Sequence, residues 1–96
     1  ILSKEEYHEY LTTKFKVSYL AKHFATKEAF SKAAGTGLFR KGLSPLILSI
    51  SHDALGKPIF KPNRKYLQFL NSLNIKTAHV SITDTNETSA AVVILE

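Results

Sequence analysis

Apolar residues recur at helical spacing in the first third of the chain and at alternating positions near its end. Ser3-Lys4-Glu5-Glu6 has a serine followed three residues later by a glutamate, the capping box that opens many helices. Apolar positions at helical spacing follow it, so a short first helix is predicted. Residues 15–34 then contain neither proline nor glycine, and Gly35-Thr36-Gly37 is expected to end this second, longer helix.

The long predicted helix carries apolar side chains on two sides. One stripe repeats every three to four residues: Val17, Leu20, Ala21 and Phe24. A second group falls on the far side of the helical wheel: Phe15, Tyr19, Phe30 and Ala33. Two apolar sides are typical of a helix at the centre of a domain, and we expect the first stripe to pack inward.

The middle of the chain predicts a hairpin and a third helix. Residues 46–50 are expected to form a strand, residues 53–56 a turn and residues 57–60 the returning strand. Because proline cannot donate to a sheet, Pro58 is expected at an edge or at a strand start. Asn63 is a candidate cap for a helix that ends near Asn74.

The end of the chain alternates cleanly between apolar and polar residues. In residues 78–83 the apolar and polar side chains are expected on opposite faces of a strand, and residues 90–95 are predicted to pair with it across a turn at 84–87. Helices first, then strands with one interposed helix, predict an α+β fold. We expect a single domain over residues 1–96, with a long central helix packed on a mainly antiparallel sheet.

Composition narrows the class of protein. The 96 residues are 44% apolar and 22% charged, which fits one folded domain and excludes a disordered tail. The chain has no cysteine, which excludes disulfides, iron–sulfur clusters and thiol nucleophiles and leaves a reducing cytoplasm as the expected location. No run approaches the ~18 consecutive apolar residues of a membrane span, so no membrane partner is expected.

The charge balance leaves two classes of function open. Thirteen Lys and Arg against eight Asp and Glu give a net charge of +5, which favours an acidic partner or a phosphate-bearing ligand. One class is an enzyme acting on such a ligand, and the other is a non-catalytic basic module that binds nucleic acid or an acidic protein. Aromatic residues do not interleave with the basic ones in an RNA-binding pattern, so nucleic acid is the less favoured partner.

Glu28 is the residue that stands out on the long helix. It follows Phe24 by one turn on the stripe that we expect to pack inward. A buried carboxylate must meet a cation, a metal or a hydrogen-bond network, because an unpaired charge is costly away from water. Lys32, four residues on, is a natural partner, although spacing alone favours an ordinary i,i+4 pair at an exposed edge.

Two further groups of polar residues are candidates for ligand contact. Cations surround the glycine turn at 35–37, namely Lys27, Lys32, Arg40 and Lys41. A helix C-terminus repels anions, so this turn by itself is favoured only as a helix stop. His79, Ser81 and Thr83 share one strand face, a pattern that a half-solvated strand also shows.

The segment from residue 24 to residue 37 closely resembles a family signature. It reads Phe24-Ala25-Thr26-Lys27-Glu28-Ala29-Phe30-Ser31-Lys32-Ala33-Ala34-Gly35-Thr36-Gly37. It is similar to the F-x-x-K-E-A-x-x-K-A-x-G-T-G signature of holo-[acyl-carrier-protein] synthases, the small 4′-phosphopantetheinyl transferases. Residues 1–6, 56–58 and 79–83 resemble further segments of that family in the same order, so the resemblance covers essentially all 96 residues.

The resemblance implies a reaction and its residues. The family moves the 4′-phosphopantetheine group from coenzyme A to a serine of apo acyl carrier protein, releasing adenosine 3′,5′-bisphosphate, in fatty acid biosynthesis. Glu28 would ligate Mg²⁺ together with the pyrophosphate, Lys32 would stabilise the leaving phosphate, and Lys27 would help with phosphate charge or proton transfer. The residues implied to bind coenzyme A are Lys32, Gly35, Gly56, Lys57, Pro58 and His79.

The resemblance also implies partners, and this sequence differs from the family's pattern at several positions. It implies a homotrimer with active sites at subunit interfaces and a basic surface for the acidic carrier protein. Family members begin with a strand whose aspartate is the second magnesium ligand, followed by a basic helix, and we expect both to precede Ile1 in a longer chain. His23 stands where the family commonly has arginine, which predicts a weaker phosphate contact, and Asp84 replaces a common histidine.

Overall fold

The computed structural model describes residues 1–37, 43–85 and 88–96. The helices are α1 (Lys4–Thr12), α2 (Lys16–Ala34), the 3₁₀ helix η1 (Pro45–Ile47) and α3 (Arg64–Ser72). The strands are β1 (Ile50–His52), β2 (Pro58–Phe60), β3 (Ala78–Asp84) and β4 (Ser89–Leu95). Arg40 and Lys41, expected near the glycine turn, and residues 86–87 of the last predicted turn lie outside the described residues.

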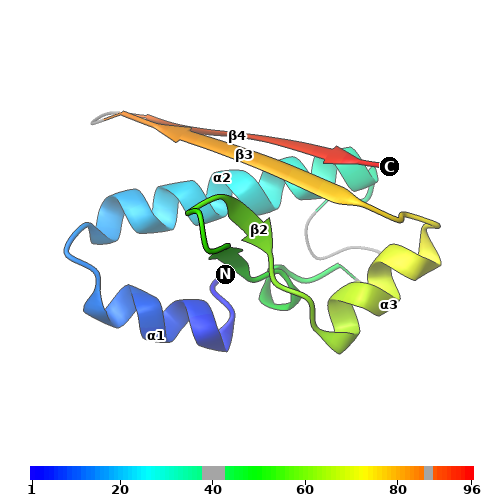
Figure 1. Ribbon diagram of the computed structural model, residues 1–96, viewed down its shortest axis with the longest axis horizontal. Helices are drawn as coiled ribbons and strands as arrows, with labels where there is room; N and C mark the ends of the chain where they lie inside the picture. Colours follow the sequence, from blue (N-terminus) through cyan, green and yellow to red (C-terminus); the bar gives the residue numbers. More distant parts are fainter. Residues whose placement is uncertain (38–42, 86–87) are drawn as a thin grey trace.

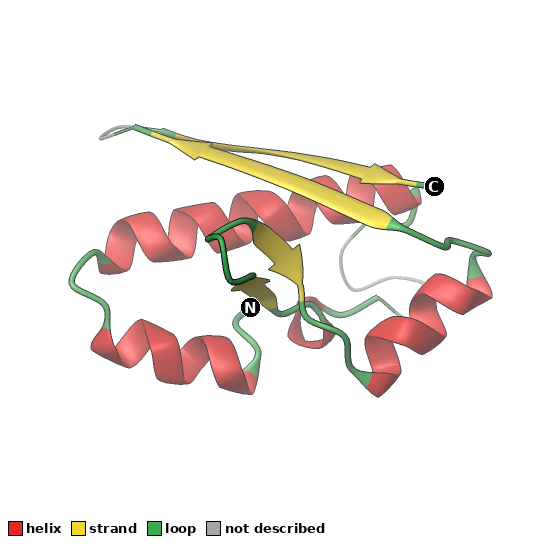
Figure 2. Ribbon diagram, viewed as in Figure 1, coloured by secondary structure: helices red, strands yellow, loops and turns green. Residues whose placement is uncertain are grey.

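The long helix α2 is the element that the others pack around. Figure 1 shows the β3–β4 hairpin running along α2, with α1 and α3 below the helix and the short β1–β2 hairpin between them, where β2 contacts β3. Both hairpins are antiparallel, and within the described residues they form separate two-stranded sheets. Figure 2 shows the same division into helices and strands, and the predicted α+β class is confirmed.

The capping residues predicted from the sequence lie at the helix ends in the structure. The Ser3 hydroxyl accepts from the Glu6 N–H, and the Glu6 carboxylate accepts from the Ser3 N–H, so the predicted capping box is present. Gly35 ends α2 with φ +77°, a left-handed conformation that favours glycine. The Asn63 side chain accepts from the Tyr66 N–H at 2.9 Å and caps α3 as predicted.

The first predicted strand is displaced toward the C-terminus. Residues 45–47, most of which we expected in a strand, form η1, and β1 begins only at Ile50. The reason is local, because the Ser44 hydroxyl accepts from the Leu46 N–H and Pro45 fixes a backbone angle suited to a helical first turn. Pro58 lies at the start of β2 opposite His52, as its missing N–H predicted.

The inward face of α2 differs from the predicted one. We expected the stripe from Val17 to Phe24 to pack inward, but these side chains are exposed, and Val17 retains 84% of its accessible surface. The buried positions are Tyr19, His23, Thr26, Lys27, Phe30 and Ser31. Apolar spacing could not distinguish the two sides, because both carry large apolar residues; long-range contacts of Tyr19, Lys27 and Phe30 decide the orientation.

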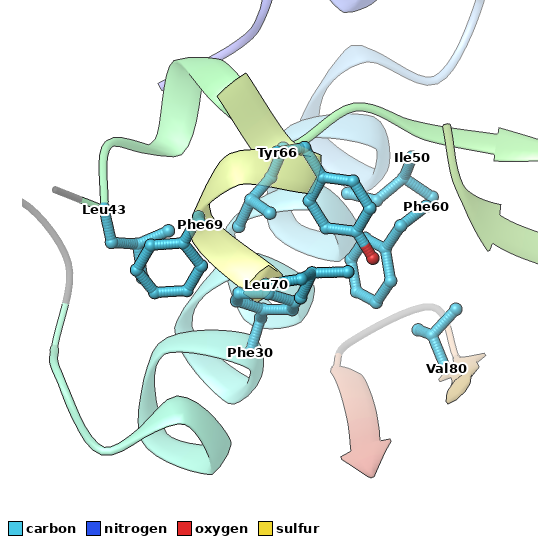
Figure 3. Packing of buried hydrophobic residues seen from close by; sticks show 9 residues of the cluster. Phe30, Leu43, Ile50, Phe60, Tyr66, Phe69, Leu70 and Val80 are labelled. Carbon is cyan, nitrogen blue, oxygen red and sulfur yellow. The ribbon is translucent and has the colours of Figure 1, made fainter. Parts of the chain in front are cut away.

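The core gathers around Phe30. Its ring lies 5.1 Å from the ring of Phe60, edge to face, and 6.0 Å from those of Tyr66 and Phe69, measured between centroids. Figure 3 shows these rings with Ile50, Leu70 and Val80 around them. The residues come from α2, α3 and three strands, so one cluster joins both sides of the domain.

The β3–β4 hairpin has the predicted alternation. Val80 is buried and Ile82 half-buried against α2, whereas His79, Ser81 and Thr83 are exposed. On β4 the exposed face is apolar and contains Val92 and Ile94. Across the residues that the structure describes, the helices are all too short or too polar to cross a membrane.

We predict that Phe30→Ala lowers the free energy of unfolding by about 3–5 kcal/mol, because it removes a fully buried ring at the centre of the aromatic cluster. Chemical denaturation followed by circular dichroism measures this. Phe15→Ala is the matched control, since that ring is exposed and its loss should change stability by less than about 0.5 kcal/mol. Equal losses for the two variants would contradict the assignment of the core.

Candidate active site

Glu28 and Lys32 form an exposed ion pair on α2. The Lys32 ammonium nitrogen lies 3.3 Å from Glu28 Oε1, and the two side chains retain 75% and 42% of their accessible surface. Glu28 is therefore not on a buried face, and the pair has the i,i+4 geometry that spacing alone favoured. Side by side on one helix turn, a carboxylate and an ammonium can contact a cation and an anion that arrive together.

Gly35 follows this pair at the C-terminal end of α2. A side-chain carbon built at Gly35 would meet no heavy atom of the described residues within 4 Å, so none of these residues fills the space beside the backbone. Its positive φ is strained for any other residue. The end of α2 thus combines a carboxylate, a cation and backbone that a ligand can approach closely.

The segment from Gly56 to Pro58 is held in a defined turn by Asp53. Asp53 Oδ1 accepts from the N–H groups of Leu55 and Lys57, both at 2.9 Å. Hydrogen bonds to the charged carboxylate, that from Lys57 first, lower the pKa of Asp53. Gly56 has φ +86°, which permits the tight return into β2. Sequence reasoning took Asp53 only as part of a turn and missed its role in shaping this loop.

His79 projects from the exposed face of β3. Its Nε2 lies 3.3 Å from Glu96 Oε1, and both side chains are exposed. Among the described residues, no hydrogen bond or ion pair joins His79 or the segment 56–58 to Glu28. The chain therefore brings Glu28 and Lys32 together directly and keeps Gly35 at the end of the same helix, whereas the segment 56–58 and His79 lie on separate elements.

Lys27 is placed differently from the expectation. Its side chain is 0% exposed, and its ammonium donates to Glu6 Oε1 at 2.6 Å, to the Ile1 carbonyl at 2.6 Å and to the Pro45 carbonyl at 2.8 Å. Burial lowers the pKa of Lys27 because leaving water disfavours the ammonium, while Glu6 opposes that shift. Direct contact with a substrate phosphate does not fit this burial.

His23 lies in the same interior cluster and not on a phosphate-facing surface. Its Nδ1 is 2.8 Å from the Tyr19 carbonyl, which only accepts, so Nδ1 carries the proton. Its Nε2 is buried, lies 3.4 Å from Glu6 Oε2 and has no hydrogen-bond partner among the described residues. Burial lowers the pKa of His23, and the expected weakened phosphate contact from this residue is not available.

Sequence reasoning identified Glu6 as a helix-capping residue and missed the rest of its contacts. Besides capping α1, the carboxylate meets Lys27, His23 and the Ile50 N–H. A signal was present on the helical wheel. Lys27 lies three residues before Phe30 and four after His23, on the face that proves to be buried, and a buried lysine requires a carboxylate nearby.

Comparison with known proteins identifies the family of this chain. A family profile described as the 4′-phosphopantetheinyl transferase superfamily matches residues 1–93. The holo-[acyl-carrier-protein] synthase of Blochmanniella pennsylvanica is 43% identical over all 96 residues, which correspond to 76% of its own length. This chain belongs to the holo-[acyl-carrier-protein] synthase family.

Solved structures of the family agree with the fold. The holo-[acyl-carrier-protein] synthase of Neisseria meningitidis superposes with a TM-score of 0.92 at 42% identity, covering 100% of this chain and 76% of that one. The Helicobacter pylori synthase, solved in complex with coenzyme A, gives a TM-score of 0.80 at 30% identity and covers 98% and 76%. The predicted family, fold class and identity as a phosphopantetheine-transferring enzyme are therefore confirmed.

We predict that this family member loses stability as the pH falls below about 6.5, the ordinary pKa of histidine. The folded state keeps His23 neutral to lower pH than the unfolded chain does, so the unfolded chain binds more protons in that window. The free energy of unfolding should fall by up to about 1.4 kcal/mol per pH unit. Denaturation curves at pH 5.5 to 7.5 measure the slope.

His23→Gln should flatten that slope, because the proton uptake is lost. His8→Gln is the control: His8 is exposed on α1, and its replacement should leave the slope in place. The assignment fails if wild type and His23→Gln show the same dependence on pH.

Proposed function

We propose that this chain transfers the 4′-phosphopantetheine group from coenzyme A to a serine of apo acyl carrier protein, with Glu28 and Lys32 as its catalytic residues. The observation that carries the assignment is the exposed pair itself, 3.3 Å apart on the helix segment that matches the family signature. The Helicobacter pylori relative was solved with coenzyme A, which supports this donor. The names of the relatives support acyl carrier protein as acceptor.

Mg²⁺ fits the donor set as a shared ion. The described residues contain no group of three or more His, Cys, Asp or Glu side chains able to hold a metal, and Glu28 offers one carboxylate. Magnesium in proteins is commonly bound by one or two carboxylates with the remaining positions filled by water and substrate phosphate. When bound there, it would neutralise charge on the pyrophosphate.

The protein residues then have defined tasks in an in-line displacement. The serine oxygen of the carrier forms a bond to the phosphorus that bears the pantetheine arm as its hydroxyl proton passes to solvent water, and the bond from that phosphorus to the bridging oxygen breaks. The bridging oxygen keeps the electron pair and leaves as part of adenosine 3′,5′-bisphosphate. Lys32, as an exposed ammonium beside Glu28, stabilises the negative charge that develops on this leaving group.

The remaining predicted residues are proposed to bind coenzyme A. Gly35 lets the pyrophosphate approach the end of α2, where no described residue fills the space beside the backbone. Gly56, Lys57 and Pro58 line the nucleotide pocket on the turn that Asp53 shapes. His79, exposed on β3, faces the 3′-phosphate, and binding there exchanges its contact with Glu96 for one with the phosphate.

The proposed enzyme is a cytoplasmic homotrimer with active sites at the subunit interfaces. The exposed apolar face of β4 and the exposed stripe of α2 support burial against other subunits. The net charge of +5 supports association with an acidic carrier protein. The absence of cysteine is in keeping with a reducing compartment.

We predict that Glu28→Gln lowers the magnesium-dependent transfer rate at least about 100-fold, because a metal-ligating charge is lost at constant side-chain size. Mass spectrometry of apo acyl carrier protein incubated with coenzyme A and Mg²⁺ measures the transfer. The fold should be unaffected, since an exposed i,i+4 pair contributes only about 0.3–0.5 kcal/mol.

Glu5→Gln is the matched control for this experiment. Glu5 is an exposed carboxylate that also pairs with a lysine, Lys61, but lies on α1. Transfer by this control should match wild type. Full transfer by Glu28→Gln would rule out its role as metal ligand, and a wild-type chain that transfers nothing would rule out the proposed function.

We also predict that Val92→Asp converts the trimer to monomers, because it places a charge in the centre of the exposed apolar face of β4. Size-exclusion chromatography with light scattering measures the mass. Asn71→Asp, on the exposed side of α3, is the control and should remain trimeric. A wild-type chain that is monomeric at every accessible concentration would contradict the proposed assembly.

A further inference from the structure

Glu6 joins three parts of the fold through one buried carboxylate. Oε1 accepts from the Ser3 N–H at 3.0 Å and from the Lys27 ammonium at 2.6 Å. Oε2 accepts from the Ile50 N–H at 2.9 Å. The start of α1, the middle of α2 and the first residue of β1 are therefore held at fixed distances from a single group.

Lys27 completes the connection from the side of α2. Its three hydrogens have three acceptors, which are Glu6 Oε1 and the carbonyls of Ile1 and Pro45. An ammonium with three short, differently directed hydrogen bonds fixes both the height and the rotation of the helix that carries it. No hydrogen remains for a substrate phosphate, so any effect of Lys27 on the reaction must pass through its neighbours.

Stability alone is a poor explanation for this pair. Moving two charges out of water costs about as much as their attraction returns, so apolar residues of similar volume often give an equally stable core. An ion pair with directed hydrogen bonds additionally fixes the orientation of the elements that carry its two residues. The pair is therefore expected to serve a part of the molecule whose orientation must be fixed.

The candidate catalytic residues lie on the elements that this pair connects. Glu28 follows Lys27 directly on α2, so a rotation of the helix that moves one moves the other. Ile50 opens β1, which leads through the Asp53 turn into the segment from Gly56 to Pro58. A misplacement of about 1 Å in a reacting group can reduce a rate about 100-fold.

We propose that Lys27 and Glu6 are positioning residues of the transferase, which set the orientation of Glu28 relative to the β1–β2 hairpin while neither touches the substrate. This inference rests on the proposed function. It assigns to Lys27 a role through Glu6 in place of the direct phosphate contact or proton transfer that the resemblance implied.

The decisive variant removes both charges at once. Lys27→Met alone leaves a buried, unpaired carboxylate and is expected to destabilise the fold strongly, whereas the double variant Glu6→Gln, Lys27→Met leaves no buried charge of this pair. The glutamine oxygen still accepts a backbone N–H, and methionine fills the volume of the lysine stem. Glu5→Gln, Lys61→Met is the matched control, because it removes an exposed ion pair that also involves α1.

Two measurements separate positioning from folding. Isothermal titration of coenzyme A with and without Mg²⁺ reports how far the metal tightens binding, and steady-state transfer to apo acyl carrier protein reports kcat and KM. Both are made at a temperature where circular dichroism shows each variant fully folded. For the double variant we expect the Mg²⁺-dependent tightening and kcat each to fall about 10-fold or more, with KM for the carrier unchanged.

The outcomes distinguish a failure of the positioning role from a failure of the proposed function. A folded double variant with wild-type tightening by Mg²⁺ and wild-type kcat overturns the positioning role and leaves the proposed function in place. A wild-type chain that neither binds coenzyme A nor transfers the group overturns the proposed function, and this inference with it. A loss confined to the double variant, with the control unchanged, supports both.

Discussion

The buried contact between Glu6 and Lys27 is the constraint on which the arrangement of this domain depends. The two residues are 21 positions apart, and their 2.6 Å hydrogen bond holds α1 against α2. Together with the contacts of Tyr19 and Phe30 it sets which side of α2 faces inward, because a lysine bonded to a buried carboxylate must lie on the inward side of its helix. The aromatic cluster around Phe30 then packs on the side that this pair has turned toward the core.

The same rotation explains why Glu28 and an apolar stripe are both exposed. With Lys27 and Phe30 inward, the face that carries Val17, Leu20 and Phe24 must point away from the core, and Glu28 lies at its end. An exposed apolar stripe that leads to a carboxylate is unfavourable in an isolated subunit. It becomes favourable when a second subunit covers it, as in the proposed trimer.

Elements with local signals could be predicted from the sequence, and the orientation of α2 could not. The capping box at Ser3, the glycine at 35 and the Asn63 cap act over three or four residues, so the sequence contains them directly. The strand expected at residues 46–50 was displaced by an equally local feature, the Ser44 cap ahead of Pro45. Apolar spacing favoured the wrong side of α2, because the deciding contact joins residues distant in sequence.

The candidate site shows the same division between local and long-range information. Glu28 and Lys32 could be paired from their spacing, and the family signature supplied the chemistry that spacing alone did not. Lys27 lies within that signature but faces the interior, so membership of a signature does not decide whether a residue touches substrate or supports one that does. Burial and the number of free hydrogens decide it: Lys32 keeps its ammonium in solvent, available to a phosphate, whereas Lys27 has its three hydrogens engaged by protein oxygens.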